Sequence, residues 1–217
     1  MEAPHPAQGP ATVDSELARL SSIERWQDTQ ALHVPLWQAR TAYMVRLLKR
    51  ELGARRETSR SLTLVEFGCA TMETERALRA EGLGHFEYLP SDCFRRDERT
   101  LVGNLEDAAF RRTLPCVDVF FLAGVLEYLE DPVPVLRALA GRSRYLFFSY
   151  CPRMPHHDER VRLGWKNHYT EVEMRILARS LGAELCAEGG FDPGAEKPVF
   201  TYFVASAASA PGGRKAA

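Results

Sequence analysis

The chain has 217 residues, 45% of them hydrophobic and 26% charged, which is enough to bury one sizeable core, so we expect one main domain. Lys and Arg total 28 and Asp and Glu total 29, so the formal net charge of −1 gives no overall attraction to the phosphate backbone of a nucleic acid. This composition excludes a generally basic nucleic-acid-binding protein and favours a small molecule or a protein as partner.

Both ends of the chain have little to bury. Residues 1–13 and residues 209–217 are rich in Pro, Gly, Ala and Ser, so we expect both segments to be disordered.

Residues 14–56 have the pattern of a helical segment. Apolar residues recur there at helical spacing in two groups: Leu17, Leu20 and Ile23, then Trp37, Met44 and Leu48. Pro35 biases Val34 away from helix, so we expect two amphipathic helices that separate at this point. Because Trp37 lies on the apolar stripe, we expect it in the core, together with Trp26 and Tyr43.

From residue 57 to 208 strands alternate with helices, which predicts a parallel, doubly wound sheet. The expected strands are LTLVEFG, HFEYLPS, RTLVGN, VDVFFLAG and RYLFFSYC, with helices at about 73–80, 106–112 and 133–140. A last helix begins at a capping box, Thr170 with Glu173, and ends at Gly182. Two final strands, AELCAEGG and KPVFTYFVAS, should pair as an antiparallel hairpin at one sheet edge. The predicted fold is a Rossmann-like α/β domain, mostly parallel, preceded by N-terminal helices.

Cysteine usage and the N-terminus indicate the compartment. The five cysteines are scattered and form neither a CxxC pair nor a Cys/His ligand set: Cys69, Cys93, Cys116, Cys151 and Cys186. This pattern predicts reduced core residues. No apolar signal core and no run near 20 apolar residues is present, so we expect a cytoplasmic protein without a membrane segment.

The first strand runs into the loop where a doubly wound sheet holds its ligand. A dinucleotide loop uses three glycines so that the backbone can approach two phosphates. Here only Gly68 is present, and Met72 would occupy phosphate space, which argues against NAD, FAD and nucleoside triphosphates. S-adenosylmethionine has no phosphate and needs a tight turn, an acid for the ribose and a groove for adenine. Asp92, 24 residues after Gly68, is the expected ribose ligand, and the Asn104 amide is a candidate for the adenine edge.

Several segments together resemble the class I S-adenosylmethionine-dependent methyltransferases over about residues 57–208. They are LVEFGCATM, SDCF, LVGNLED, VDVFFLAGVLEYLEDPVPVLRAL and GWKNHYTEVEMRILARSLGAEL. The most specific is LAGVLEYLEDP, which is similar to the fourth-strand motif of the family. The first motif of the family, acid-x-Gly-x-Gly-x-Gly, keeps only Glu66 and Gly68 here. In this family an N-terminal helical segment, here residues 14–56, often lies over the active site as a lid.

The resemblance implies roles for the residues that match its motifs. Glu66 would steady the loop and the methionine end of the cofactor. Ala70 replaces the middle glycine, a mild change if its φ is negative, and Met72 would pack on the cofactor. Ala123 and Gly124, at the end of the fourth strand, either leave room for the ligand or allow close helix packing.

A general base is expected in the long connection after the fifth strand. His168 is the preferred candidate, because it lies two residues before the Thr170 cap and close to the aromatic residues Trp165 and Tyr169. The alternative is a pair, His156 and His157, which would serve as base or, with Asp158, as part of a metal site. We expect no metal.

The sequence thus predicts a methyltransferase that uses S-adenosylmethionine and modifies an oxygen or nitrogen of a small molecule. The resemblance of GWKNHYT to loops of glycan-modifying and natural-product-modifying members favours such substrates, among them a sugar-containing or glycan-like acceptor. The alternative is a catalytically inactive binding or scaffold subunit with the same fold. The sequence does not indicate the oligomeric state.

Overall fold

A computed structural model of the chain describes residues 26–27, 35–153, 160, 163–181, 184–191 and 199–205. The expectations for residues 1–13 and 209–217, and for most of the first predicted helix, fall outside the described residues. Where the second helix was predicted, helix α3 spans Pro35–Ala54 and begins at the proline.

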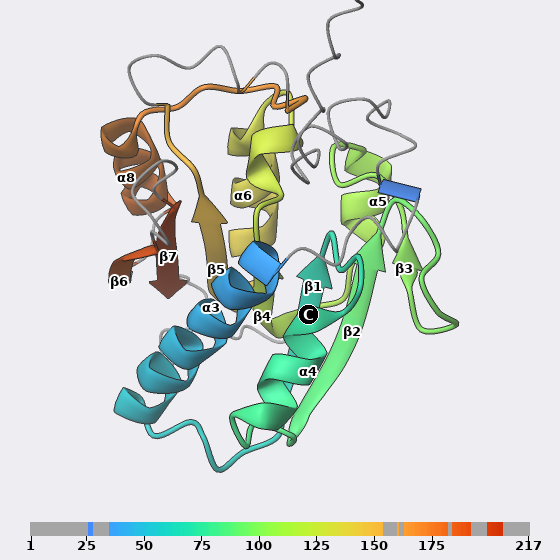
Figure 1. The fold of residues 1–217 in the computed structure, drawn as a ribbon, viewed down its shortest axis with the longest axis vertical. Coiled ribbons are helices and arrows are strands. Elements are labelled where there is room, and N and C mark those ends of the chain that lie inside the picture. The colour runs from blue at the N-terminus through green and yellow to red at the C-terminus, as the bar shows by residue number, and fades with distance from the viewer. Residues whose placement is uncertain are drawn as a thin grey trace, which may run out of the picture.

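Seven strands form one sheet in the order β3-β2-β1-β4-β5-β7-β6 (Figure 1). The strands are β1 (Leu62–Phe67), β2 (Phe86–Asp92), β3 (Leu101–Val102), β4 (Val117–Leu122), β5 (Ser143–Tyr150), β6 (Glu184–Phe191) and β7 (Val199–Ala205). The first five pair in parallel, whereas β7 pairs antiparallel with both β5 and β6. The predicted doubly wound sheet with an antiparallel C-terminal hairpin is therefore confirmed.

Helices cover both faces of this sheet because its inner strands alternate two sets of apolar side chains. On β5, Phe147 packs with α3 and with α4 (Glu73–Ala80), whereas its neighbour Phe148 packs on the opposite face. That opposite face is covered by α6 (Pro132–Ala140) and α8 (Glu171–Ser180), which Figure 1 shows beyond the sheet from α3. The short helix α5 (Ala108–Thr113) follows β3. Successive strand residues point to opposite faces, so both faces are buried.

The caps explain where the helices begin. Thr170 and Glu173 form the predicted capping box of α8. The Thr170 hydroxyl accepts from the Glu173 amide, and the Glu173 carboxylate accepts from the Thr170 amide. Asp107 and Asp131 cap α5 and α6 through their side chains. The predicted helix at 106–112 therefore starts two residues later, at Ala108, because Asp107 is its cap.

Helix α3 is a layer of the domain core. Its residues Met44, Val45, Leu48 and Leu52 are fully buried, and the helix packs on α4. Only its first turns carry residues that reach the cavity described below. Within the described ranges, no helix combines the length and the apolar character needed to cross a bilayer.

Cysteine burial differs in part from expectation. Cys69 and Cys151 are buried free thiols, as predicted, but Cys93 and Cys116 are exposed free thiols. Cys93 directly follows β2 and Cys116 directly precedes β4, in connections where sequence spacing does not determine burial. The burial of Cys186 lies outside what the structure describes.

Candidate functional site

The loop from β1 to α4 keeps a glycine-type backbone at three alternate positions. Gly68, Ala70 and Met72 have φ values of 63°, 43° and 57°, all in the left-handed region. The condition for a mild replacement at Ala70, a negative φ, is therefore not met. A left-handed conformation costs a residue with a Cβ about 1–2 kcal/mol, so the loop is strained at two positions where glycine would relax it.

The amides of this loop are used inside the protein. The N–H of Cys69 donates to the Ser91 carbonyl at 3.2 Å, and the N–H of Met72 donates to the Cys69 carbonyl at 2.6 Å. The N–H of Ala70 donates to Asp92 Oδ2 at 3.1 Å. A phosphate-binding loop instead presents a row of free amides to its ligand. The arrangement supports the expectation that the site is not built for phosphates.

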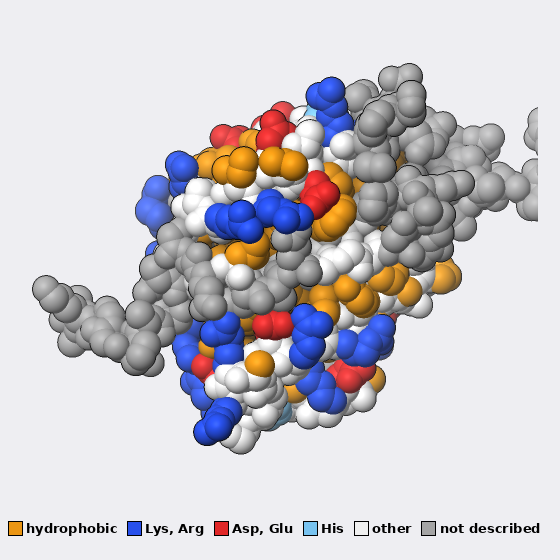
Figure 2. Space-filling view, turned by 90° about the vertical axis from the view of Figure 1, so that its left-hand side faces the viewer, with side chains coloured by type: hydrophobic (Ala, Val, Ile, Leu, Met, Phe, Trp, Pro, Cys, Tyr) orange, Lys and Arg blue, Asp and Glu red, His pale blue; other side chains and the backbone are white. Residues whose placement is uncertain are grey.

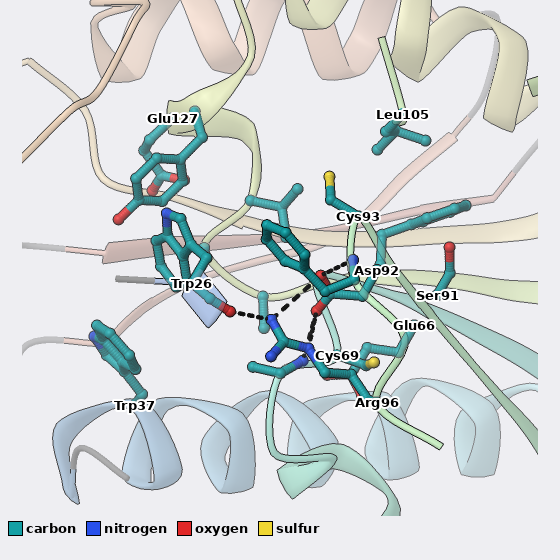
Figure 3. Close-up of a pocket in the computed structure, with 18 of the residues that line it drawn as sticks. Trp26, Trp37, Glu66, Cys69, Ser91, Asp92, Cys93, Arg96, Leu105 and Glu127 are labelled. Atoms are coloured by element: carbon teal, nitrogen blue, oxygen red, sulfur yellow. Dashed lines mark hydrogen bonds and ion pairs between the residues drawn. The ribbon is translucent and has the colours of Figure 1, made fainter. Parts of the chain in front are cut away.

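Asp92, the expected ribose ligand, ends β2 and is 8% exposed. Its carboxylate accepts from Ala70 and from the Phe94 amide, and it forms an ion pair with Arg96, whose Nε lies 3.1 Å from Oδ2. Arg96 also donates to the Trp26 carbonyl, as Figure 3 shows. Arg96 was not predicted from the sequence, where its only local signal is its position four residues after Asp92.

Glu66, at the end of β1, ties the loop to its surroundings. It is buried and accepts hydrogen bonds from the hydroxyls of Thr74, in the first turn of α4, and Tyr88 on β2. Burial raises the pKa of Glu66 to about 8, and the nearby charges of Asp92 and Glu73 act in the same direction. These bonds connect the start of the loop to α4 and to β2. The role of Glu66 toward the cofactor stays a prediction.

Gly124 is small because an arginine from α3 lies on it. Gly124 has a φ of 67°, and a Cβ there would lie 2.3 Å from Nη1 of Arg40. Arg40 Nη2 donates to the Ala123 carbonyl at 3.0 Å, while its buried Nε has no hydrogen-bond partner among the described residues. Burial lowers the pKa of Arg40, and the charge of Glu127 opposes this shift. The Arg40 guanidinium therefore occupies the space beside Ala123 and Gly124, which the sequence did not indicate.

Asn104 also lies at this edge of the sheet. Its side-chain oxygen accepts from the Glu106 amide at 2.9 Å, which closes a turn before α5. Its NH2 group and the second lone pair of this oxygen remain for a contact with an adenine. The turn that Asn104 forms is therefore compatible with a ligand role.

These residues surround a cavity of about 370 Å³ at the carboxyl ends of the strands. Glu66, Gly68, Ala70, Asp92, Asn104, Ala123 and Gly124 all line it. Trp26, Trp37 and Trp165 line it as well. The prediction that Trp26 and Trp37 are core residues is therefore wrong. Figure 3 shows Trp26, Trp37 and Glu127 along one side and Asp92, Cys93 and Leu105 across from them. The volume falls in the range typical of small-molecule sites.

Glu127 lies in the 3-10 turn η1 (Leu126–Tyr128) that follows β4, and it is 2% exposed. Its Oε1 accepts from the Cys151 amide at 2.8 Å, but its buried Oε2 has no partner within the described part of the chain. Burial raises the pKa of Glu127, and the guanidinium charges of Arg40 and Arg160 oppose this shift.

Two buried side chains hold this turn. Asn167 donates to the carbonyls of Leu126 and Leu129 at 2.6 and 2.8 Å. Arg160, which is fully buried, donates to the Asn167 carbonyl at 3.0 Å and to the Cys151 carbonyl. The segment GWKNHYT thus positions the turn, and its central residue is Asn167.

His168 is exposed and is not among the residues that line the cavity. Its Nδ1 accepts a hydrogen bond from Arg160 Nε at 3.2 Å. His168 is thus engaged by the buried Arg160 and does not line the described cavity.

The alternative base or metal ligands, His156, His157 and Asp158, lie outside the described residues. Among the residues that the structure does describe, no group of three or more His, Cys, Asp or Glu side chains could hold a metal ion.

On the face in Figure 2, the described Lys and Arg side chains lie in small groups, separated by acidic, hydrophobic and uncharged side chains.

Comparisons with known proteins identify the fold. No protein-family model matches the chain, and no curated protein matches it. A solved 1,6-didemethyltoxoflavin-N1-methyltransferase from Burkholderia thailandensis is similar at a TM-score of 0.63 and 14% identity, covering 93% of each chain. The plantazolicin methyltransferase BpumL is similar at a TM-score of 0.60 and 9% identity, covering 79% of this chain and 86% of the other. An S-adenosylmethionine-dependent methyltransferase from Aquifex aeolicus has a TM-score of 0.57 and 15% identity, with 83% and 98% covered. The chain has the class I methyltransferase fold.

Proposed function

We propose that this chain, which has the class I methyltransferase fold, binds S-adenosylmethionine and transfers its methyl group to an oxygen or nitrogen of a small molecule. The observation that carries the proposal is the loop at residues 68–72. It keeps the left-handed backbone of a glycine-rich cofactor loop even where its residues are Ala70 and Met72. Its amides are engaged within the protein, which suits a nucleoside cofactor without phosphates.

The residues around the cavity fit this cofactor. Asp92 and Asn104 both line the cavity. In this proposal Asp92 binds the ribose hydroxyls and the Asn104 amide binds the adenine edge. Arg40, with its buried and unpartnered Nε, would bind the carboxylate of the methionine part. When bound, the cofactor supplies an electrophilic methyl group on a sulfonium, and the chain contributes mainly by holding the acceptor in line with it.

A second candidate is a binding or scaffold subunit that does not turn over. The observation that favours it is the ion pair between Asp92 and Arg96, because a ribose would have to share the carboxylate with this arginine. The acceptors named for proteins of this fold include a toxoflavin precursor, a plantazolicin analogue and a porphyrin, so the fold alone does not select an acceptor.

Isothermal titration calorimetry with S-adenosylmethionine and S-adenosylhomocysteine tests the proposal directly. The native protein should bind both compounds. Arg40→Met should weaken both about 10- to 100-fold, the effect of losing a hydrogen bond between charged groups. Arg46→Met is the matched control, because Arg46 is exposed on the same helix and does not line the cavity. Absence of binding by the folded native protein would favour the scaffold subunit.

A further inference from the structure

An aromatic wall forms one side of the cavity. It consists of Trp26, Trp37, Tyr128 and Trp165, which include all three tryptophans of the chain. The rings of Trp26 and Trp37 are stacked with centroids 5.8 Å apart, and Trp26 packs edge-on against Tyr128 at 4.9 Å. In Figure 3 the rings of Trp26 and Trp37 lie across the cavity from Asp92. We assign this side of the cavity to the acceptor. Indole faces bind flat rings by stacking and apolar burial.

Three buried polar atoms of this lining lack a partner. Among the described cavity-lining side chains, the buried nitrogen and oxygen atoms without a hydrogen-bond partner are Arg40 Nε, Glu127 Oε2 and Trp165 Nε1. Arg40 lies against Gly124 and belongs to the cofactor side. In the described part of the acceptor side, the buried unpartnered atoms are therefore an acceptor on Glu127 and a donor on Trp165. A buried polar atom without a partner is costly, so a ligand that satisfies it gains specificity.

This count limits the acceptor. A sugar has several hydroxyl groups, and each would need a partner on burial. The polar residues of GWKNHYT do not supply them, since Asn167 holds the η1 turn and Lys166 is exposed and paired with Glu130. An ammonium ion is disfavoured because the charges of Arg40 and Arg160 reach Glu127. The site fits a flat, uncharged ring with one hydroxyl group.

We propose that the methyl acceptor is an aromatic compound with a ring hydroxyl, stacked on the aromatic wall, and that Glu127 Oε2 takes the hydroxyl proton. This inference rests on the proposed methyltransferase function. As the proton moves to Glu127, the hydroxyl oxygen uses its electron pair to bond the methyl carbon. The carbon–sulfur bond breaks, its electron pair stays on sulfur, and the products are an aryl methyl ether and a neutral thioether.

Hydrogen bonds restrict the motion of the Glu127 carboxylate and of the turn that carries it. Glu127 Oε1 is anchored by the Cys151 amide, which leaves the unpartnered Oε2 of this cavity-lining residue for a ligand. The turn that carries it is fixed by Asn167 and, through the Glu127 carbonyl, by the Lys166 amide at 2.8 Å. A carboxylate with restricted motion and a raised pKa suits a general base near neutral pH.

The first experiment measures binding without turnover. Because every tryptophan of the chain lines the cavity, its intrinsic fluorescence reports on ligands that enter it. The probes are 4-nitrophenol and 4-nitroanisole, titrated with S-adenosylhomocysteine present and at a pH below the pKa of 4-nitrophenol, so that its hydroxyl group keeps the proton. The two probes share the ring, and only the first can donate a hydrogen bond. We expect the native protein to bind 4-nitrophenol about tenfold more tightly or better. Methyl β-glucoside is titrated in parallel. Equal binding of the two aromatic probes, or tighter binding of the glucoside, would overturn the inference.

The second experiment uses Glu127→Gln. The amide oxygen can keep the bond from Cys151 and present its NH2 group to the cavity, so discrimination between the two probes should disappear while 4-nitroanisole binding stays unchanged. With labelled S-adenosylmethionine, methyl transfer to 4-methylphenol, whose hydroxyl group is not ionised near neutral pH, should fall by on the order of 10² to 10⁴. Glu130→Gln is the matched control, since Glu130 lies three residues away, is exposed, and should leave both readouts as in the native protein. Native-like discrimination in Glu127→Gln would refute the role of Glu127.

A third variant separates stacking from proton transfer. Trp37→Leu should weaken both nitro probes about three- to tenfold and keep their ratio, because it removes a wall ring without touching the carboxylate. A native-like affinity for both would remove the wall from the binding site. Binding of S-adenosylhomocysteine is measured independently of the probes. If it fails, the methyltransferase function fails; if it persists without probe discrimination, only the acceptor class and the base are wrong.

Discussion

Replacing Ala70 by glycine should stabilise the fold, although the same change in a helix destabilises it. Ala70 has a φ of 43°. The left-handed conformation costs a non-glycine residue about 1–2 kcal/mol, while the greater freedom of glycine in the unfolded chain costs about 0.5–1 kcal/mol relative to alanine. The bond from the residue 70 amide to Asp92 is retained, because glycine keeps the N–H. The free energy of unfolding should therefore rise by about 0.5–1 kcal/mol.

Urea unfolding of Ala70→Gly is compared with that of Ala109→Gly. Ala109 is exposed and helical in α5, so the second variant should lose about 0.5–1 kcal/mol. Met72→Gly should change stability little and cofactor binding by less than about tenfold, because relief of strain is offset by lost packing of the Met72 side chain. If Ala70→Gly destabilises as much as Ala109→Gly, then the loop does not hold residue 70 in a strained conformation.

Three further predictions concern the pH dependence and the site. Glu66 has a folded pKa of about 8 against an ordinary value of 4.5, so the folded state binds the extra proton between these values. Stability should fall as pH rises from about 5 to 8, by up to about 1.4 kcal/mol per pH unit, and urea unfolding of Glu66→Gln should lack this component. Gly124→Ala should lower the free energy of unfolding by at least about 1 kcal/mol in the same assay, because its φ is positive and the new Cβ meets Arg40. His168→Asn should leave cofactor affinity and turnover near native across roughly pH 6 to 9; a loss of turnover with a basic pH dependence would return the base role to His168.

The fold was predictable because its signals are local. Apolar alternation with period 2 and period 3.6, the Thr170 capping box and the Asp residues before helices depend on neighbours within a few positions. Strand ends were therefore placed within one or two residues at β1, β2, β4 and β5. The hairpin was expected at a sheet edge. Which of its two strands pairs with β5 was not predicted, because the position of β7 between β5 and β6 depends on contacts between distant segments.

The site was predictable only where a motif sits at the end of a strand. Glu66, Gly68 and Asp92 lie at the carboxyl ends of adjacent parallel strands, and the topology brings these ends to one edge whatever the side chains are. The left-handed backbone at Ala70 was missed, because alanine carries no local signal for a positive φ. It is imposed by the loop, whose start Glu66 connects to α4 and to β2.

The sequence by itself determined the layered α/β architecture, the position of the cofactor loop and the class of cofactor that the loop favours. Only the tertiary structure decided which side chains complete the cavity. Arg40 reaches Gly124 from a helix 84 positions earlier in the chain, and Glu127 is oriented by the amide of Cys151 at the end of another strand. His168, prominent in the sequence, is engaged by the buried Arg160 and does not line the described cavity. The physical reason is that periodicity and capping act between neighbours in sequence, whereas burial, charge pairing and the satisfaction of polar atoms depend on which distant segments pack together.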